Sequence, residues 1–201
     1  MYILKAPAIA QINVKNSRFI AEVFAVTSQS VARDKIKEQK DKYFDARHVV
    51  HAFVIGKKTE ILGMSDDGEP SGTAGHPVLD VLKGREITDV LLTVTRYFGG
   101  TLLGTGGLVK AYGAAAKAVL DIAPIELFVE KKSFSFSVSY EMYEKVKRLL
   151  PAFKVSDINE KFDTVVSIRG CVPVTNAEEL ANAIFNATKG AVQVLYNKAN
   201  I

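Results

Sequence analysis

Residues 89–122, DVLLTVTRYFGGTLLGTGGLVKAYGAAAKAVLDI, carry the strongest secondary-structure signal in the chain. The apolar run at 89–98 predicts a buried β-strand. The stretch at 106–122 is dense in alanine, the residue with the highest helix propensity, and predicts a helix. A glycine-rich loop joins the two. The segment therefore predicts a buried strand that leads through this loop into a helix.

The glycine-rich loop allows two interpretations. Glycines leave main-chain amides uncovered, and a helix N-terminus adds unpaired N–H groups and a partial positive charge, so the loop is a candidate anion-binding site. Alternatively, the glycines only let the helix pack closely on the sheet. The spacing matches neither of the common nucleotide-binding loops. The candidate anion- or nucleic-acid-binding residues are Arg96 at the strand end, Gly99, Gly100, Gly104, Gly106 and Gly107 in the loop, and Lys110 and Lys117 on one face of the helix.

Composition places the chain among ordinary globular proteins. It has 201 residues, of which 48% are hydrophobic and 24% charged, and its formal net charge is +4. This charge permits contact with nucleic acid without requiring it. The single cysteine, Cys171, excludes an internal disulfide framework and a CxxC zinc site. No apolar run approaches the roughly 18 residues of a membrane span, and the N-terminus lacks a secretory pattern, so we expect a cytoplasmic protein without membrane contact.

Glycine usage divides the chain into two predicted domains. Twelve of the fourteen glycines precede residue 123, and Pro124 should end the alanine-rich helix. We therefore predict domains at 1–122 and 123–201. The order of elements in the second domain, β-α-β-β-α-β, is that of a ferredoxin-like unit. Its strands are predicted at 132–139, near 153–159, near 162–170 and at 191–196.

The second unusual segment is an acidic loop at 65–77, SDDGEPSGTAGHP. Its glycines and prolines predict a rigid turn. Asp66, Asp67 and Glu69 offer acid–base groups or hard oxygen ligands for a cation. They could equally cap backbone amides and pair with Arg96 or Arg47, a common use of such carboxylates. The catalytic candidates are Asp66, Asp67, Glu69 and His48; no metal or cofactor is predicted.

The two segments together resemble a known family. SDDGEPSGTAGHPVLDVL at 65–82 and VTRYFGGTLLGTGGLVKAYGAAAKAVL at 94–120 are similar to the signature of the IMPACT family, in particular its bacterial YigZ-like members. DARHVVHAFVIG at 45–56 resembles the family strand that carries a histidine, here His48. The family strand usually continues with Asn-Cys and an aromatic residue, whereas this chain has Val49, Val50 and His51.

The resemblance implies an α+β protein of two domains. The first would have the ribosomal protein S5 domain 2-like α/β sandwich, and the second would be ferredoxin-like, similar to domain V of elongation factor G. It further implies a non-catalytic protein that binds nucleic acid or the ribosome, is linked to the regulation of translation and has a possible protein partner. The alternative is an enzyme on a small phosphorylated or acyl substrate that uses the Asp66/Asp67/Glu69 loop. Because the site lacks a complete acid–base constellation, we favour RNA or ribosome binding.

Overall fold

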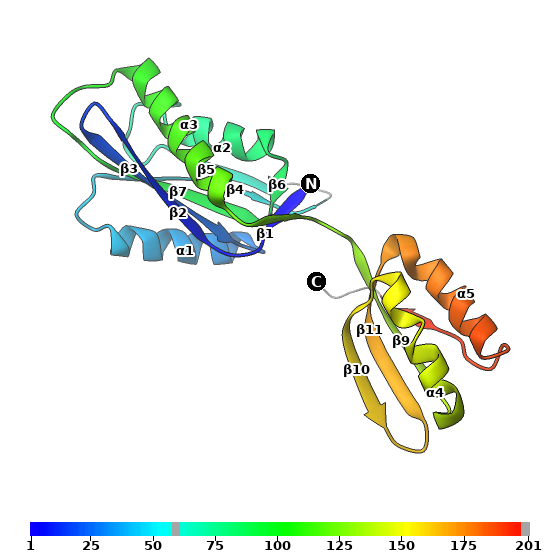
Figure 1. Cartoon of the computed structure of the whole chain (residues 1–201). Helices are drawn as coiled ribbons and strands as arrows, with labels where there is room; N and C mark the ends of the chain where they lie inside the picture. The colour runs from blue at the N-terminus through cyan, green and yellow to red at the C-terminus, as the bar shows by residue number, and fades with distance from the viewer. Residues whose placement is uncertain (58–60, 198–201) are drawn as a thin grey trace. The chain divides into compact units, whose positions relative to one another are not determined.

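The structure, a computed structural model, describes residues 1–57 and 61–197 and divides into two compact units, Met1–Phe128 and Val129–Ile201 (Figure 1). The first unit ends six residues later than the predicted boundary at residue 122. The reason is β8 (Ile125–Leu127), which pairs antiparallel with β1 (Tyr2–Leu4) and so ties the chain after Pro124 to the first unit. Each unit is described by itself.

A five-stranded antiparallel sheet forms the centre of the N-terminal unit, in the order β2-β3-β7-β4-β5. Helices α2 and α3 cover one face of this sheet, and α1 lies on the other (Figure 1). β1 forms a small second sheet with β6 and β8. The remaining elements are β2 (Ala8–Val14), β3 (Ser17–Ala25), α1 (Gln29–Lys42), β4 (His48–Ile55), β5 (Ile61–Ser65), α2 (Gly75–Gly84), β6 (Ile87–Thr88), β7 (Val90–Tyr97) and α3 (Thr105–Ile122).

The segment that opened the sequence analysis lies at the centre of this unit. β7 pairs with β3 and with β4, and its residues are buried except for the half-buried Tyr97 at its end. α3 follows through the glycine loop and packs Leu108, Tyr112 and Val119 into the core. Burial on both faces explains why this strand reads as a continuous apolar run.

The strands that sequence patterning did not predict are β1, β2, β6 and β8. β2 is an edge strand, and its residues alternate between half-buried and exposed. Pro7 immediately precedes it, and its apolar residues are interrupted by Gln11 and Asn13. β1, β6 and β8 have only two or three residues each, too few to show a period.

The C-terminal unit has the βαββαβ order, and its sheet is antiparallel in the order β10-β11-β9-β12. The first and third strands are central and the second and fourth lie at the edges, so this unit is ferredoxin-like, and the α+β fold class is confirmed. One core cluster joins the sheet to both helices. The elements are β9 (Lys131–Val138), α4 (Tyr140–Lys147), β10 (Ser156–Phe162), β11 (Val166–Pro173), α5 (Ala177–Ala187) and β12 (Leu195–Asn197).

The second and third strands of this unit in chain order, β10 and β11, begin later than predicted. The chain after α4 forms a 3-10 turn at Leu150–Phe153, and Lys154 then adopts a left-handed conformation with φ +54°. The turn uses the residues expected to begin the strand near 153, so β10 begins at Ser156. Among the described residues, no helix is both long and apolar enough to cross a membrane.

Candidate functional site

Asp66 in the acidic loop holds the entry to α2. Its Oδ2 accepts a hydrogen bond from the amide of Gly72 at 2.8 Å, and its Oδ1 accepts from the amides of Ala74 at 3.0 Å and Gly75 at 2.8 Å. Burial alone would raise the pKa of the Asp66 carboxyl group, but these three amide bonds outweigh it and hold the pKa below its ordinary value. Asp66 is therefore an ionised anchor for the loop and the helix start.

This anchor predicts a pH dependence. Because the folded-state pKa of Asp66 is lowered, its contribution to stability is complete above the unfolded pKa of 3.8 and is lost as the pH falls through the folded value. The urea midpoint of the N-terminal unit should therefore fall when the pH is lowered from 5 to 3. In Asp66→Asn the midpoint should be lower at pH 5 and should fall less steeply. An unchanged slope in this variant would contradict the assignment.

Asp67 joins the loop to two other elements. Its Oδ2 accepts from the amide of Val49 at 2.7 Å, and its Oδ1 pairs with Lys40 of α1. Burial would raise the pKa of Asp67, but the bonds from Lys40 and Val49 hold it below its ordinary value. The main-chain carbonyl oxygen of Asp67 lies 2.8 Å from Nδ1 of His48. A carbonyl can only accept, so Nδ1 carries the proton and Nε2 of His48 is left for another partner.

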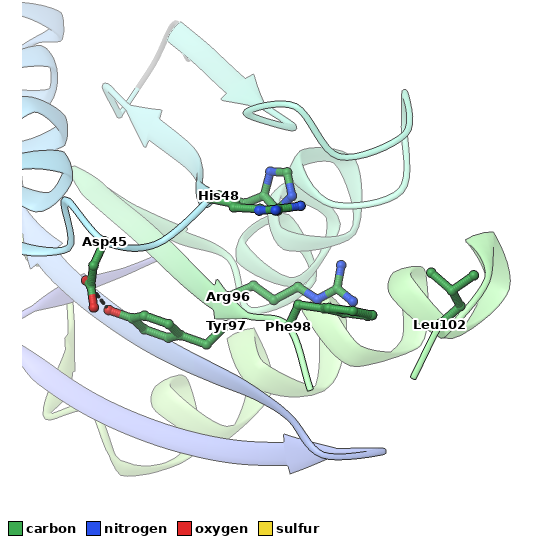
Figure 2. A pocket seen from close by; sticks show the side chains of 7 residues that line it. Asp45, His48, Arg96, Tyr97, Phe98 and Leu102 are labelled. Atoms are coloured by element: carbon green, nitrogen blue, oxygen red, sulfur yellow. Dashed lines mark hydrogen bonds between the residues drawn. The ribbon is translucent and has the colours of Figure 1, made fainter. Parts of the chain in front are cut away.

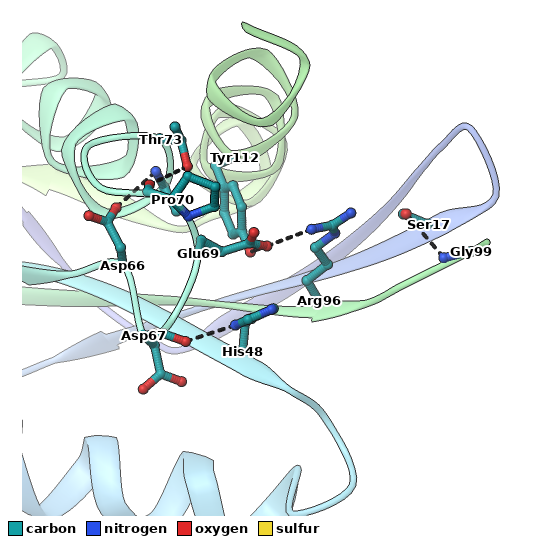
Figure 3. A network of polar contacts seen from close by, with 11 residues as sticks. Ser17, His48, Asp66, Asp67, Glu69, Pro70, Thr73, Arg96, Gly99 and Tyr112 are labelled. Carbon is teal, nitrogen blue, oxygen red and sulfur yellow. Dashed lines mark hydrogen bonds and ion pairs between the residues drawn. The ribbon is translucent and has the colours of Figure 1, made fainter. Parts of the chain in front are cut away.

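Glu69 lies at the centre of a buried ion pair. Its Oε1 accepts from Nη1 of Arg96 at 2.7 Å and from the hydroxyl of Tyr112 at 2.7 Å (Figure 3). The side chains of Arg96 and Glu69 are only 8% and 3% exposed. Burial and the bond to Glu69 raise the pKa of Tyr112 above its ordinary value, so the phenol remains a donor. The three side chains join the acidic loop to β7 and α3.

All three carboxylates of the acidic loop therefore have structural partners, and the arginine that the loop engages is Arg96 rather than Arg47. The structure brings His48 and Arg96 together as cross-strand partners of β4 and β7. Among the residues predicted for catalysis or anion binding, these two line a cavity of about 470 Å³ (Figure 2). The lining residues are Asp45, Arg47, His48, Arg96, Tyr97, Phe98 and Leu102.

The side chains around this pocket combine cations with accessible aromatic rings. Phe98 is 52% exposed and Leu102 is 83% exposed. The guanidinium group of Arg18 lies 4.3 Å from the centroid of the Tyr97 ring, in cation–π geometry. Sequence reasoning did not select Arg18, Tyr97, Phe98 or Leu102. The available signal was the pair Tyr97-Phe98 between a buried strand and Gly99-Gly100, where two aromatic rings meet the end of the sheet.

The glycines of the loop serve different purposes. Gly99 donates its amide to the Ser17 hydroxyl at 3.2 Å, and a Cβ there would overlap the backbone of Asn16. Gly100 and Gly104 have φ of +83° and +71°, which favours glycine. A Cβ at Gly106, by contrast, meets nothing within 4 Å.

Thr105 and Gly106 at the start of α3 and its two lysines are exposed. Leu108 donates to the carbonyl of Gly104 at 2.9 Å, so the amides of residues 105–107 precede the first helical bond. Lys110 and Lys117 are exposed, and neither lines the pocket. The start of α3 therefore has amides without a partner from the preceding turn, and it and the two lysines lie outside the lining of the pocket.

Comparison with known proteins places this geometry in a family. Residues 15–120, more than half of the chain, match the model of the Impact N-terminal domain. The chain belongs to the IMPACT family. The matched region includes the acidic loop, the pocket and the glycine loop, and the resemblance seen in the sequence is confirmed.

Two bacterial proteins and one solved structure illustrate the similarity over most of the chain. An IMPACT family member of Haemophilus influenzae is 36% identical over 166 residues, covering 82% of this chain and 81% of that protein. The IMPACT family member YigZ of Escherichia coli is 32% identical, covering 94% of each chain. A crystal structure described as a hypothetical protein is similar over 99% of this chain and 98% of that chain, with 31% identity and a TM-score of 0.66.

Proposed function

We propose that this IMPACT protein binds single-stranded RNA through the pocket side of its N-terminal unit, as a binding protein without catalysis. The observation that carries the proposal is that the exposed ring of Phe98 and the half-buried ring of Tyr97 lie together with arginines at the pocket. Proteins that bind single-stranded nucleic acid use such surfaces, because bases stack on aromatic side chains while cations follow the phosphates. Binding to the ribosome, a role in translation, a protein partner and a cytoplasmic location remain predictions.

The exposed cations supply the electrostatic part of the proposal. Arg47 lines the pocket and is exposed, and Arg18 is exposed and lies over the ring of Tyr97 in the lining. Lys110 and Lys117 are exposed on α3. Within residues 1–57 and 61–197, none of these four forms an ion pair. Contacts from such groups to phosphates release counterions, so they give affinity that depends on salt and not on base sequence.

The partners of the carboxylates favour binding over the enzymatic alternative. An acid–base role for the acidic loop would require that one of its three carboxylates reach the ligand. Asp66, Asp67 and Glu69 instead hold amides and cations of the protein itself, and none of them lines the pocket. We therefore assign the acidic loop the task of positioning His48 and Arg96.

RNA binding predicts a specific salt dependence. For a 12-nucleotide single-stranded RNA, the wild-type logarithm of affinity should fall linearly with the logarithm of salt concentration. The double variant Arg18→Gln/Arg47→Gln should bind at least tenfold more weakly in low salt. Its slope should be shallower by about 0.7 for each lost phosphate contact. Fluorescence anisotropy at several salt concentrations measures both quantities.

The matched control for this pair is Arg33→Gln, which removes an exposed arginine from α1 and should leave affinity and slope unchanged. Lys110→Glu/Lys117→Glu tests the contribution of α3 in the same assay. If the wild-type protein does not bind at low salt, or if both double variants bind as tightly as wild type, RNA binding by this surface is excluded.

A further inference from the structure

The pocket changes character along its length. Asp45 and Tyr97 lie at one end and Leu102 at the other, with His48, Arg96 and Phe98 between them (Figure 2). At the first end, the Tyr97 hydroxyl donates to Oδ1 of Asp45 at 2.7 Å. A ligand that fills the pocket therefore needs a polar end, a group that suits cations in the middle, and an apolar or aromatic end.

The middle of the pocket offers a cation to an anion and a ring nitrogen to a hydroxyl group. Nδ1 of His48 donates its proton to the Asp67 carbonyl, so Nε2, which carries no proton in this tautomer, is left to accept a hydrogen bond from a ligand hydroxyl. Arg96 uses Nη1 on Glu69, and its guanidinium group lies 5.6 Å from the Phe98 ring centroid. Its buried Nε has no hydrogen-bond partner within the described chain. The pairing with Glu69 holds this guanidinium in place at the pocket wall.

The charges around the pocket leave a small positive excess. Arg47, Arg96 and Arg18 over the Tyr97 ring are positive, whereas Asp45 in the lining and Glu69 behind Arg96 are negative. A doubly charged terminal phosphate would meet too little positive charge, and it would also be repelled by Asp45. A phosphodiester carries a single negative charge and suits this wall better.

The apolar end offers a surface for a base. Arg96 approaches the Phe98 ring, yet half of the Phe98 side chain is still exposed, and Leu102 extends into solvent beside it (Figure 2). Stacking on an aromatic ring accepts every base, and it requires that the base be unpaired.

We propose that this pocket holds one phosphodiester step of unpaired RNA, with the phosphate at Arg96, a ribose hydroxyl at Nε2 of His48 and one flanking base against Phe98. The second nucleoside lies toward Tyr97 and Asp45. The inference rests on the proposed function and adds to it the size of the bound unit, which is a dinucleotide step and not a free phosphate or a strand end.

The experiment uses the full chain and three small probes: the dinucleoside monophosphate ApA, adenosine monophosphate and inorganic phosphate. Binding is followed by NMR through the amides of residues 45–48 and 96–102. ApA should shift these amides and bind at least about fivefold more tightly than either other probe. Phe98→Ala should weaken ApA by at least about fivefold, because the stacking contact is lost. Phe44→Ala, which removes an 84% exposed ring outside the pocket, should have no effect.

His48→Asn separates the contact of His48 Nε2 with the ligand from the hydrogen bond between Nδ1 and the Asp67 carbonyl. The shorter amide can still donate to the Asp67 carbonyl, but it has no atom in the place of Nε2. The variant should keep the wild-type amide spectrum outside the pocket and lose ApA binding.

The outcomes distinguish this inference from the proposed function. If the 12-nucleotide RNA binds but ApA does not, or if inorganic phosphate binds as tightly as ApA, the dinucleotide pocket is overturned while RNA binding stands. If neither the RNA nor ApA binds, both proposals fall. If ApA binds and Phe98→Ala and His48→Asn bind it as wild type does, its site is elsewhere and the pocket assignment is wrong.

Discussion

Replacing Glu69 with alanine is expected to lower the free energy of unfolding of the N-terminal unit by about 3–5 kcal/mol. The substitution leaves Arg96, whose side chain is 8% exposed, without its counter-charge, and it leaves the buried Tyr112 hydroxyl without an acceptor. A buried charge without a partner retains its full desolvation cost, which is why losing one member of such a pair costs more than the pair contributes. Urea unfolding followed by circular dichroism, with the two units fitted as separate transitions, measures the change.

Two further variants test whether the unpaired Arg96 charge causes the loss of stability in Glu69→Ala. Tyr112→Phe removes one hydrogen bond from Glu69 and should cost about 1–3 kcal/mol. Glu69→Leu combined with Arg96→Met removes both charges, and it should be less destabilising than Glu69→Ala alone. A loss below about 1 kcal/mol in Glu69→Ala would contradict the expectation. It would mean that Arg96 is hydrated through the pocket and gains little from Glu69.

Sequence patterning predicted the central strand of the sheet because nearly all of its residues are buried, and most of them are therefore apolar. The strand predicted at 89–98 became β7, within one residue at each end, and the segment at 45–56 that resembles a family strand contains β4. These strands are apolar because both faces of the sheet are covered. In an edge strand such as β2, only alternate residues are half-buried, so the apolar pattern is weaker and patterning did not predict the strand.

The candidate site was predictable in its parts but not in its arrangement. The acidic loop and the glycine loop were identified by composition, and the capping and pairing alternative for the carboxylates describes the contacts of Asp66, Asp67 and Glu69. Composition does not show whether a residue contacts a ligand or another part of the protein. Arg96 could be placed at a strand end from sequence, but its partner, 27 positions earlier in the chain, is brought to it only by the fold.

The glycine loop supplies the second large effect. Gly99→Ala should lower the free energy of unfolding by about 1–3 kcal/mol or more, the range seen when a packed site receives an extra methyl group. The added Cβ would overlap the carbonyl of Asn16 and the amide nitrogen of Ser17. These are backbone atoms of the β2–β3 turn, where Lys15 and Asn16 already have positive φ values, so they cannot move aside as a side chain would.

Gly106→Ala is the matched control in the same loop. A Cβ at Gly106 meets nothing within 4 Å, and φ there is not in the left-handed region, so alanine should raise stability by about 0.5–1 kcal/mol. Urea unfolding of the two variants compares a glycine required for packing with one that packing does not require. A loss of stability in Gly106→Ala would contradict this distinction.

Gly106→Ala also decides between the two interpretations of the loop. If the amides of residues 105–107 contact RNA phosphates, the methyl group of Gly106→Ala will hinder that approach, and affinity will fall although stability rises. If the loop serves packing alone, RNA affinity in Gly106→Ala will equal that of wild type. A variant that is more stable and binds more weakly cannot be explained by damage to the fold, so this result would assign Gly106 to the ligand.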